Sequence, residues 1–196
     1  MCEACMEEEK NYSSMNHTEA KFCLIVTGGS VDQGLLAAVY EGAYGYPVHP
    51  YVIGVDKGLE ALEQSDIEPD LIIGDFDSAN DGIRAKYVTS PDAVVRDRCI
   101  VLNPEKDFTD THVAVLEAAK CGFTRVLLLG ATGTRLDHTL GNLGLLYTCC
   151  QEGICAEILD PHNRISLIKE EKIVRAENLY GPYISLLPFS ECVKGI

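Results

Sequence analysis

The sequence predicts an α/β fold, in which a mainly parallel β-sheet carries helices on both faces and is followed by the start of a small antiparallel β domain. Three observations predict this class. Short apolar runs alternate with segments of helical pattern along most of the chain. Such alternation is typical of right-handed βαβ units, which place their strands in parallel. From about Ala156 the helical segments give way to short alternating strands with the turn sequences DPHN and YGP.

Five strands are expected in the α/β part, the first of them buried, and each is a short apolar run. They cover residues 22–29, 51–58, 71–76, 99–103 and 125–130.

Helices are expected between these strands. Ser30 and Gln33 have the spacing of a capping box, which predicts the start of a helix over LLAAVYEGA. A short helix over LEALEQSD follows the second strand, and further helices are predicted near 109–121 and 137–152. In the last one the apolar residues follow the four-three spacing of a single helical face: Leu136, Leu140, Leu143, Tyr147 and Cys150.

Three parts are expected along the chain. Residues 1–21 form a polar leader without regular structure, and residues 22–155 form the α/β domain. Residues 156–196 form a partial β domain. About forty residues rarely build a core of their own. This piece is therefore expected to dock on the α/β part or on a partner subunit, or to be only the opening of a second domain.

Charge and composition limit the function. The formal net charge of −14 argues against nucleic acid as a partner, because phosphate backbones require a basic face. A nucleotide is compatible with it, since a divalent cation can lie between carboxylates and phosphate oxygens. No apolar run reaches the ~18 residues of a membrane span, and no secretion signal is visible. A cytoplasmic location is expected, with the nine cysteines as reduced thiols.

Polar residues suited to phosphate or metal binding follow every predicted strand. In an open parallel sheet, ligands bind beyond the carboxyl ends of the strands, so these residues are expected to converge on one edge. In strand order they are Gly28, Gly29 and Ser30; Asp56, Lys57 and Gly58; Gly74, Asp75, Asp77 and Ser78; Lys106, Asp107, Thr109 and Asp110; and Gly130, Thr132, Gly133, Arg135, Asp137 and His138.

The sequence GDFDS places two like charges, Asp75 and Asp77, at the end of an apolar strand. If the chain stays extended, both side chains leave the same face and repel each other unless a cation lies between them. Mg²⁺ suits such a site, because it prefers carboxylate oxygens and keeps positions open for phosphate and water. The alternative is a solvated turn after Gly74.

The sequence KDFTD places Asp107 and Asp110 on one side of the first turn of a predicted helix. Acids there also complement the helix dipole. The adjacent Lys106 favours a phosphate partner together with a metal.

The loop GATGTRLDH offers phosphate oxygens the forked donor of Arg135 and the free amides of a helix start. The alternative is a simple turn in which Arg135 pairs with Asp137. Gly28 and Gly29 allow close approach of a phosphate, although a tight turn uses such a pair equally well. His138 is a candidate base or a capping residue.

Several familiar enzyme classes are excluded by missing motifs. The sequence contains no GxxxxGK[ST], no dinucleotide-type GxGxxG and no GxSxG. A strand that ends in Asp-x-Asp also opens the haloacid-dehalogenase phosphatase pattern. That pattern requires Thr or Val two places past the second aspartate, where this chain has Ala79.

The ordered set Asp56, PDLIIGDFDS, KDFTDT, GATGTRLDHTLGN and YISLLPFS resembles the thiamine pyrophosphokinase family, from about Phe22 to the end of the chain. The resemblance implies transfer of a diphosphoryl group from ATP to the hydroxyl of thiamine, which gives thiamine diphosphate and AMP. It also implies a Rossmann-like domain, a carboxyl-terminal β-sandwich that helps to hold thiamine, and a homodimer with sites between subunits. The last residues are expected to be only the opening of that sandwich.

The same resemblance implies roles for individual residues. Asp75, Asp77 and Asp110 are similar to the carboxylates that hold Mg²⁺ and the substrate hydroxyl, with Asp56 in support. The nucleotide-binding positions that it implies are Gly28, Gly29, Lys106, Arg135 and Asp137, and the motif residues Asp107, Thr109 and His138 are further substrate-binding candidates. Two alternatives remain for the whole chain: a Mg²⁺-dependent phosphatase, and a nucleotide or thiamine sensor without activity.

Overall fold

The computed structural model describes residues 21–76, 81–103, 105, 107–169 and 171–190. Its centre is a seven-stranded sheet in the order β4-β3-β2-β1-β5-β6-β7, parallel except for β7. The α/β class and the five predicted strands are confirmed. The strands are β1 (Phe22–Val26), β2 (Tyr51–Val55), β3 (Leu71–Gly74), β4 (Cys99–Val101), β5 (Arg125–Leu129), β6 (Cys155–Leu159) and β7 (Arg164–Ser166).

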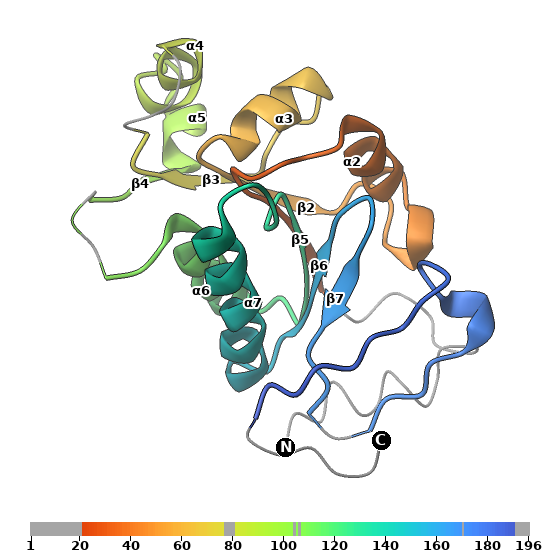
Figure 1. Ribbon diagram of the computed structural model, residues 1–196. Coiled ribbons are helices and arrows are strands. Elements are labelled where there is room, and N and C mark those ends of the chain that lie inside the picture. The colour runs from red at the N-terminus through yellow and green to blue at the C-terminus, as the bar shows by residue number, and fades with distance from the viewer. Residues whose placement is uncertain (1–20, 77–80, 104, 106, 170, 191–196) are drawn as a thin grey trace.

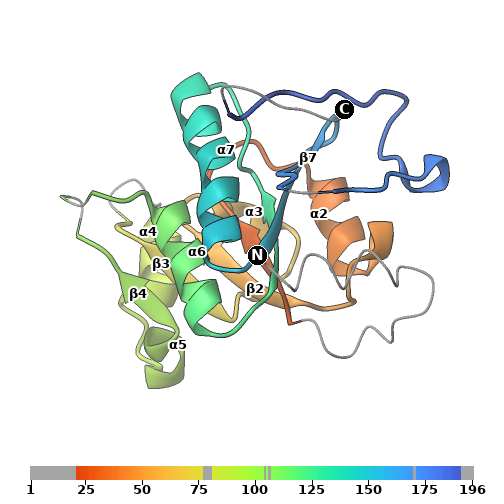
Figure 2. The same cartoon turned by 90° about the horizontal axis from the view of Figure 1, so that it is seen from below.

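Helices cover both faces of the sheet, as Figures 1 and 2 show. α6 (Asp110–Lys120) and α7 (Leu136–Gln151) lie side by side on one face, and α2 (Gln33–Tyr40) and α3 (Gly58–Gln64) contribute to the core on the other. Short elements that the sequence did not predict complete the chain: η1 (Ala43–Gly45), α4 (Asp81–Ile83), the π-helical turn η2 (Arg84–Val88), α5 (Ala93–Asp97) and η3 (Ala176–Asn178).

The alternation of side chains along each strand builds two cores, one on each face of the sheet. In β1, Leu24 and Val26 pack with α2 and α3, whereas Cys23 and Ile25 pack with α6 and α7. All five residues of β1 are buried, because parallel neighbours flank the strand and helices cover it on both sides.

The start of α2 differs from the predicted capping box. Asp32 is the N-cap, and its Oδ1 accepts a hydrogen bond from Leu35 N at 2.7 Å. Ser30 lies two positions before the cap, and its N–H donates to the carbonyl of Thr132 at 3.1 Å. Backbone pairing with the β5–α7 loop therefore holds Ser30 outside the helix.

The apolar face predicted for α7 is only partly buried. The core side consists of Leu145, Leu146 and Cys149, which form a different row on the same helix. Leu136 and Leu140 are exposed. The ring of Tyr147 stacks on that of Phe189 with centroids 6.4 Å apart, so the carboxyl-terminal segment touches the predicted face.

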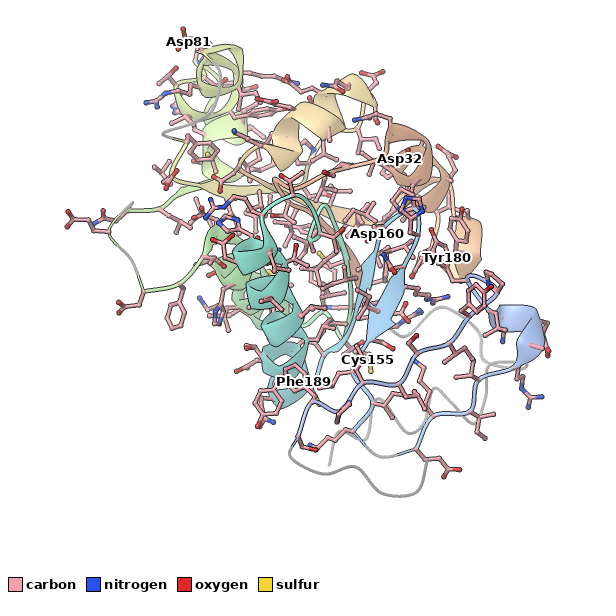
Figure 3. All side chains as sticks on the ribbon, viewed as in Figure 1. Asp32, Asp81, Cys155, Asp160, Tyr180 and Phe189 are labelled. Atoms are coloured by element: carbon pink, nitrogen blue, oxygen red, sulfur yellow. The ribbon has the colours of Figure 1, made fainter. Side chains whose placement is uncertain are left out.

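The sheet continues across the predicted domain boundary at residue 155. β6 pairs with β5 in parallel, and β7 then pairs with β6 in the antiparallel sense. The predicted DPHN turn joins them: Asp160 Oδ1 accepts from His162 N at 2.8 Å and Asn163 N at 2.7 Å. The hydroxyl of Tyr180 donates to the Asp160 carbonyl at 2.8 Å, and Figure 3 shows the two residues near each other. The division into domains stays a prediction, and residues 1–20 of the predicted leader lie outside the described residues.

Within the described ranges, none of the helices has the length and apolar character needed to cross a membrane. The thiol interpretation holds for five described cysteines, Cys23, Cys99, Cys121, Cys149 and Cys150, which are free. It is wrong for Cys155, which is disulfide-bonded.

Candidate active site

Three aspartates from different elements meet at the carboxyl edge of the sheet. Asp56 follows β2, Asp75 follows β3, and Asp110 opens α6. One carboxylate oxygen of each lies within 4.8 Å of the other two. All three residues are partly buried, so this carboxylate cluster concentrates negative charge where solvent screens it incompletely.

The backbone of Asp56 turns sharply out of β2. Its φ of 46° lies in the left-handed region, which aspartate tolerates better than most residues. Its N–H donates to the Ile73 carbonyl at 3.1 Å, and its carbonyl accepts from Leu59 N at 3.1 Å. The first bond ties Asp56 to β3 and the second to the start of α3, so the position of its carboxylate is set from both sides.

Asp75 stands between two residues with unusual roles. The preceding Gly74 lies so close to Asp56 that a Cβ atom on it would meet Asp56 Oδ1 at 2.2 Å. The following Phe76 has a φ of 55° and is 2% exposed, and its carbonyl accepts from Arg84 Nη1 at 2.8 Å. The buried ring anchors the turn after the strand, and the extended conformation ends there.

Asp77, which the sequence pairs with Asp75 as a metal ligand, lies outside the described residues. The same holds for Lys106. Their predicted roles stay predictions. Asp56, expected only to support the metal site, instead lies with Asp75 and Asp110 in the cluster.

The first turn of α6 carries two of the predicted residues. Thr109 is the N-cap, and its hydroxyl accepts from His112 N at 3.2 Å. Asp110 follows as the first helical residue, where the positive end of the helix dipole favours a carboxylate. Asp107 is exposed on the preceding loop. The structure thus gives Thr109 a capping role and brings Asp110, not Asp107, to the cluster.

The loop between β5 and α7 is held in place by side chains. Thr132 Oγ1 donates to Asp160 Oδ2 at 2.9 Å, and Asn142 Nδ2 donates to the Ala131 carbonyl at 2.8 Å. Burial works to raise the pKa of Asp160, but hydrogen bonds from His162, Asn163 and Thr132 outweigh it and hold that pKa below the ordinary value.

Arg135 and Asp137 form an ion pair on this loop, at 2.6 Å between Nη2 and Oδ2. This is the pairing that the sequence left open as an alternative to phosphate binding. The hydrogen bond from Arg135 lowers the pKa of Asp137. Both side chains are about two-thirds exposed, at 66% and 65%, and His138 is exposed as well. Exposure leaves Arg135 able to exchange Asp137 for another anion at little cost.

The two glycines after β1 have packing roles. Gly29 N donates to the Gly130 carbonyl at 2.9 Å, and a Cβ on Gly29 would meet that oxygen at 2.1 Å. Only glycine allows the loops after β1 and β5 to approach so closely. A Cβ on Gly28 would lie 3.3 Å from the Cβ of Lys57. Nucleotide binding by either glycine stays a prediction.

The donor set of the cluster fits a hard divalent cation. Three carboxylates supply oxygen ligands only, which Mg²⁺ and Ca²⁺ prefer and which softer metals do not require. Oδ1 of Asp56 and Oδ1 of Asp110 are shielded from solvent. A cation of this class would offset the repulsion among the three acids, and its remaining positions would suit phosphate oxygens.

Comparison with known proteins agrees with this chemistry. The sequence pattern described as "Thiamin pyrophosphokinase, catalytic domain" matches residues 47–158, a range that contains all three aspartates of the cluster. The chain belongs to the thiamin pyrophosphokinase family. That range also holds both ends of the β5–α7 loop, whereas Gly28, Gly29 and Asp160 lie outside it.

Relatives within the thiamin pyrophosphokinase family share a part of their length with this chain. The thiamine pyrophosphokinase of Bacillus subtilis (strain 168) is 36% identical over 145 residues, which are 73% of this chain and 64% of that protein. The crystal structure of thiamine pyrophosphokinase from Bacillus subtilis matches with a TM-score of 0.57 at 29% identity, over 71% of this chain and 61% of the other. A second, from Geobacillus thermodenitrificans, gives 0.54 at 29%, over 71% and 60%. The chain therefore spans less than two thirds of these relatives.

Proposed function

We propose that the protein is a thiamine diphosphokinase, which transfers the diphosphoryl group of ATP to the hydroxyl of thiamine and releases AMP. The observation that carries the proposal is the carboxylate cluster of Asp56, Asp75 and Asp110 inside the matched catalytic domain. The proposal names Mg²⁺ as the cation and ATP and thiamine as substrates.

The residues of the cluster have two tasks in this reaction, which are to bind the metal and to accept the proton of the thiamine hydroxyl. Asp56, Asp75 and Asp110, together with Asp77, would hold Mg²⁺, which when bound neutralises charge on the triphosphate. Asp75 or Asp110 also accepts the hydrogen bond of the thiamine hydroxyl and takes its proton as the oxygen attacks the β-phosphorus. The bond between the β-phosphorus and the bridging oxygen of the α-phosphate breaks, and AMP leaves with that oxygen.

The departing nucleotide needs cationic partners. Arg135 offers a forked donor at the start of α7, and it is exposed beside its present partner Asp137. Exchange of that carboxylate for a phosphate would keep the guanidinium paired throughout the reaction. Lys106 is proposed as the second cation and Gly28 with Gly29 as the nucleotide loop, while Asp107, Thr109 and His138 remain proposed substrate contacts.

We also infer a homodimer with sites between subunits and a cytoplasmic location. Apolar side chains on the carboxyl-terminal segment support the first inference, since Tyr183 is 89% and Leu187 is 86% exposed. The free thiols support the second, with the disulfide-bonded Cys155 as the exception.

The decisive experiment is a thiamine-dependent AMP assay with ATP and Mg²⁺. The protein should form AMP and thiamine diphosphate in equal amounts, and Asp75→Asn should lower the rate by about 100-fold or more. Asp66→Asn is the control, because it makes the same change at an aspartate that follows α3, away from the cluster. ADP in place of AMP contradicts diphosphoryl transfer. Phosphate release from simple monoesters would point to the phosphatase, and ATP binding without AMP to the sensor.

A further inference from the structure

Two buried hydroxyls link the start of α6 to the end of β1. Thr27 Oγ1 and Thr111 Oγ1 are hydrogen-bonded at 2.8 Å, although 84 positions separate them in the sequence. Each residue is 6% exposed. We propose that Thr111 is a positioning residue for the carboxylate cluster, because its bond to Thr27 fixes the first turn of α6 and so the place of Asp110. The inference rests on the proposed function, which supplies the cation.

Apolar packing sets the rotation of α6 about its axis only coarsely. The helix rests on the sheet through Ala114, Val115 and Ala118, all fully buried. These side chains are small and their contacts have no preferred direction. They determine how far α6 lies from the sheet, and they leave its first turn less constrained. A hydrogen bond is directional, so the Thr27–Thr111 pair supplies the missing constraint.

Thr111 is the neighbour of Asp110 on the helix, and successive helical residues point about 100° apart. With Thr111 directed at the end of β1, Asp110 is turned to the adjacent side, where its carboxylate meets those of Asp56 and Asp75. A rotation of the first turn by a few tens of degrees would separate the three oxygens.

The other end of the link is itself rigid. Thr27 directly follows β1, and its N–H donates to the Leu129 carbonyl at 2.9 Å, which continues the pairing of β1 with β5. The hydroxyl pair thus ties the position of Asp110 to β1, the central strand of the sheet. Valine at both positions would fill the same space without this bond. The hydroxyls are therefore expected to orient the first turn of α6 more than they contribute to packing.

The test measures the affinity of the protein for Mn²⁺ alone, from the electron paramagnetic resonance signal of free Mn²⁺. Thr111→Val should weaken binding about tenfold, the lower end for residues that orient metal ligands. Thr111→Ser keeps the hydroxyl and should restore most of the affinity. Thr148→Val, at the far end of α7, makes the same change away from the cluster and should bind as the unmodified protein does.

The double variant Thr27→Val/Thr111→Val separates positioning from stability. Each single variant leaves one buried hydroxyl unpaired and should lower the melting temperature, whereas the double variant leaves none and should recover part of it. Its Mn²⁺ affinity should nevertheless stay low. Affinity that is unchanged in Thr111→Val, or that returns to normal in the double variant, overturns the proposal, as does absence of Mn²⁺ binding by the unmodified protein. Normal Mn²⁺ binding without AMP formation contradicts the proposed function alone.

Discussion

Gly74 lies against the carboxylate of Asp56, with no room for a side chain between them. A Cβ on Gly74 would come within 2.2 Å of Asp56 Oδ1. The atom in the way belongs to a residue whose backbone is held by hydrogen bonds to β3 and α3. Asp56 Oδ1 can therefore occupy its place in the cluster only because Gly74 has no side chain.

Gly74→Ala should displace the Asp56 carboxylate and weaken divalent cation binding about tenfold. The measurement is an Mn²⁺ titration at constant ionic strength. Gly144→Ala is the control, because Gly144 lies within α7 and a Cβ there meets nothing within 4 Å. That change should leave Mn²⁺ affinity unaltered and add up to about 1 kcal/mol of stability. Equal cation affinity in both variants would contradict the prediction, because it would show that the position of the Asp56 carboxylate does not affect cation binding.

Neutralisation of one acid in the cluster should remove most of the stabilisation that a cation provides. Asp110→Asn removes repulsion among oxygens that lie within 4.8 Å, but it also loses the favourable interaction of the carboxylate with the α6 dipole, so without metal the two contributions should largely cancel. The unmodified protein should gain about 2.7 kcal/mol at Mg²⁺ concentrations 100 times its dissociation constant. Asp110→Asn should gain much less. Thermal unfolding with and without Mg²⁺ measures both effects, and a similar Mg²⁺-induced gain in both proteins would contradict a metal role for Asp110.

Arg135→Ala should separate ligand binding from structure. The Arg135–Asp137 pair is exposed, and solvent screening leaves such pairs with little effect on stability. The variant should therefore unfold at nearly the same temperature as the unmodified protein. If Arg135 binds phosphate, calorimetry should show at least about tenfold weaker ATP binding, in line with loss of a charge-assisted hydrogen bond. Asp137→Asn breaks the same pair but keeps the guanidinium, so it should weaken ATP binding less than Arg135→Ala does.

Glu157 should make stability depend on acidic pH. It accepts hydrogen bonds from Tyr46 Oη at 2.8 Å and Arg164 Nη2 at 2.8 Å. Burial works to raise the pKa of Glu157, but Arg164 and Tyr46 outweigh it and hold that pKa below the value of 4.5 in an unfolded chain. The stabilisation is therefore complete above about pH 4.5 and is lost as pH falls through the folded pKa.

Chemical unfolding at a series of pH values tests this. Glu157→Gln should be less stable than the unmodified protein at about pH 6, and the difference should shrink towards about pH 3. Glu152→Gln is a suitable comparison, because Glu152 is an exposed residue at the end of α7. A constant difference between Glu157→Gln and the unmodified protein over this range would contradict a depressed pKa for Glu157.

The sequence predicts the sheet well because its inner strands β1, β2, β3 and β5 are short, largely buried apolar runs, and the carboxyl-edge rule then brings the right residue types together. It underestimates Asp56, whose cluster role depends on a left-handed turn. Asp56 also follows a buried apolar strand, β2, so the carboxyl-edge rule predicts a metal-ligand role for Asp56 as it does for Asp75. The Thr27–Thr111 bond lies beyond sequence reasoning, since nothing local relates residues 84 positions apart. Elements as short as α4 and α5 leave too few residues for a periodic pattern.

β1 occupies the centre of the sheet, with β2 on one side and β5 on the other and helices above and below. Its amides can exchange with heavy water only when the sheet itself opens, so they should be among the slowest in the protein to exchange. The carboxyl end of this strand carries Thr27. With the proposed role of Thr111, the position of Asp110 is thus tied to the part of the molecule that opens least often, and local fluctuations of the outer strands should leave that position undisturbed.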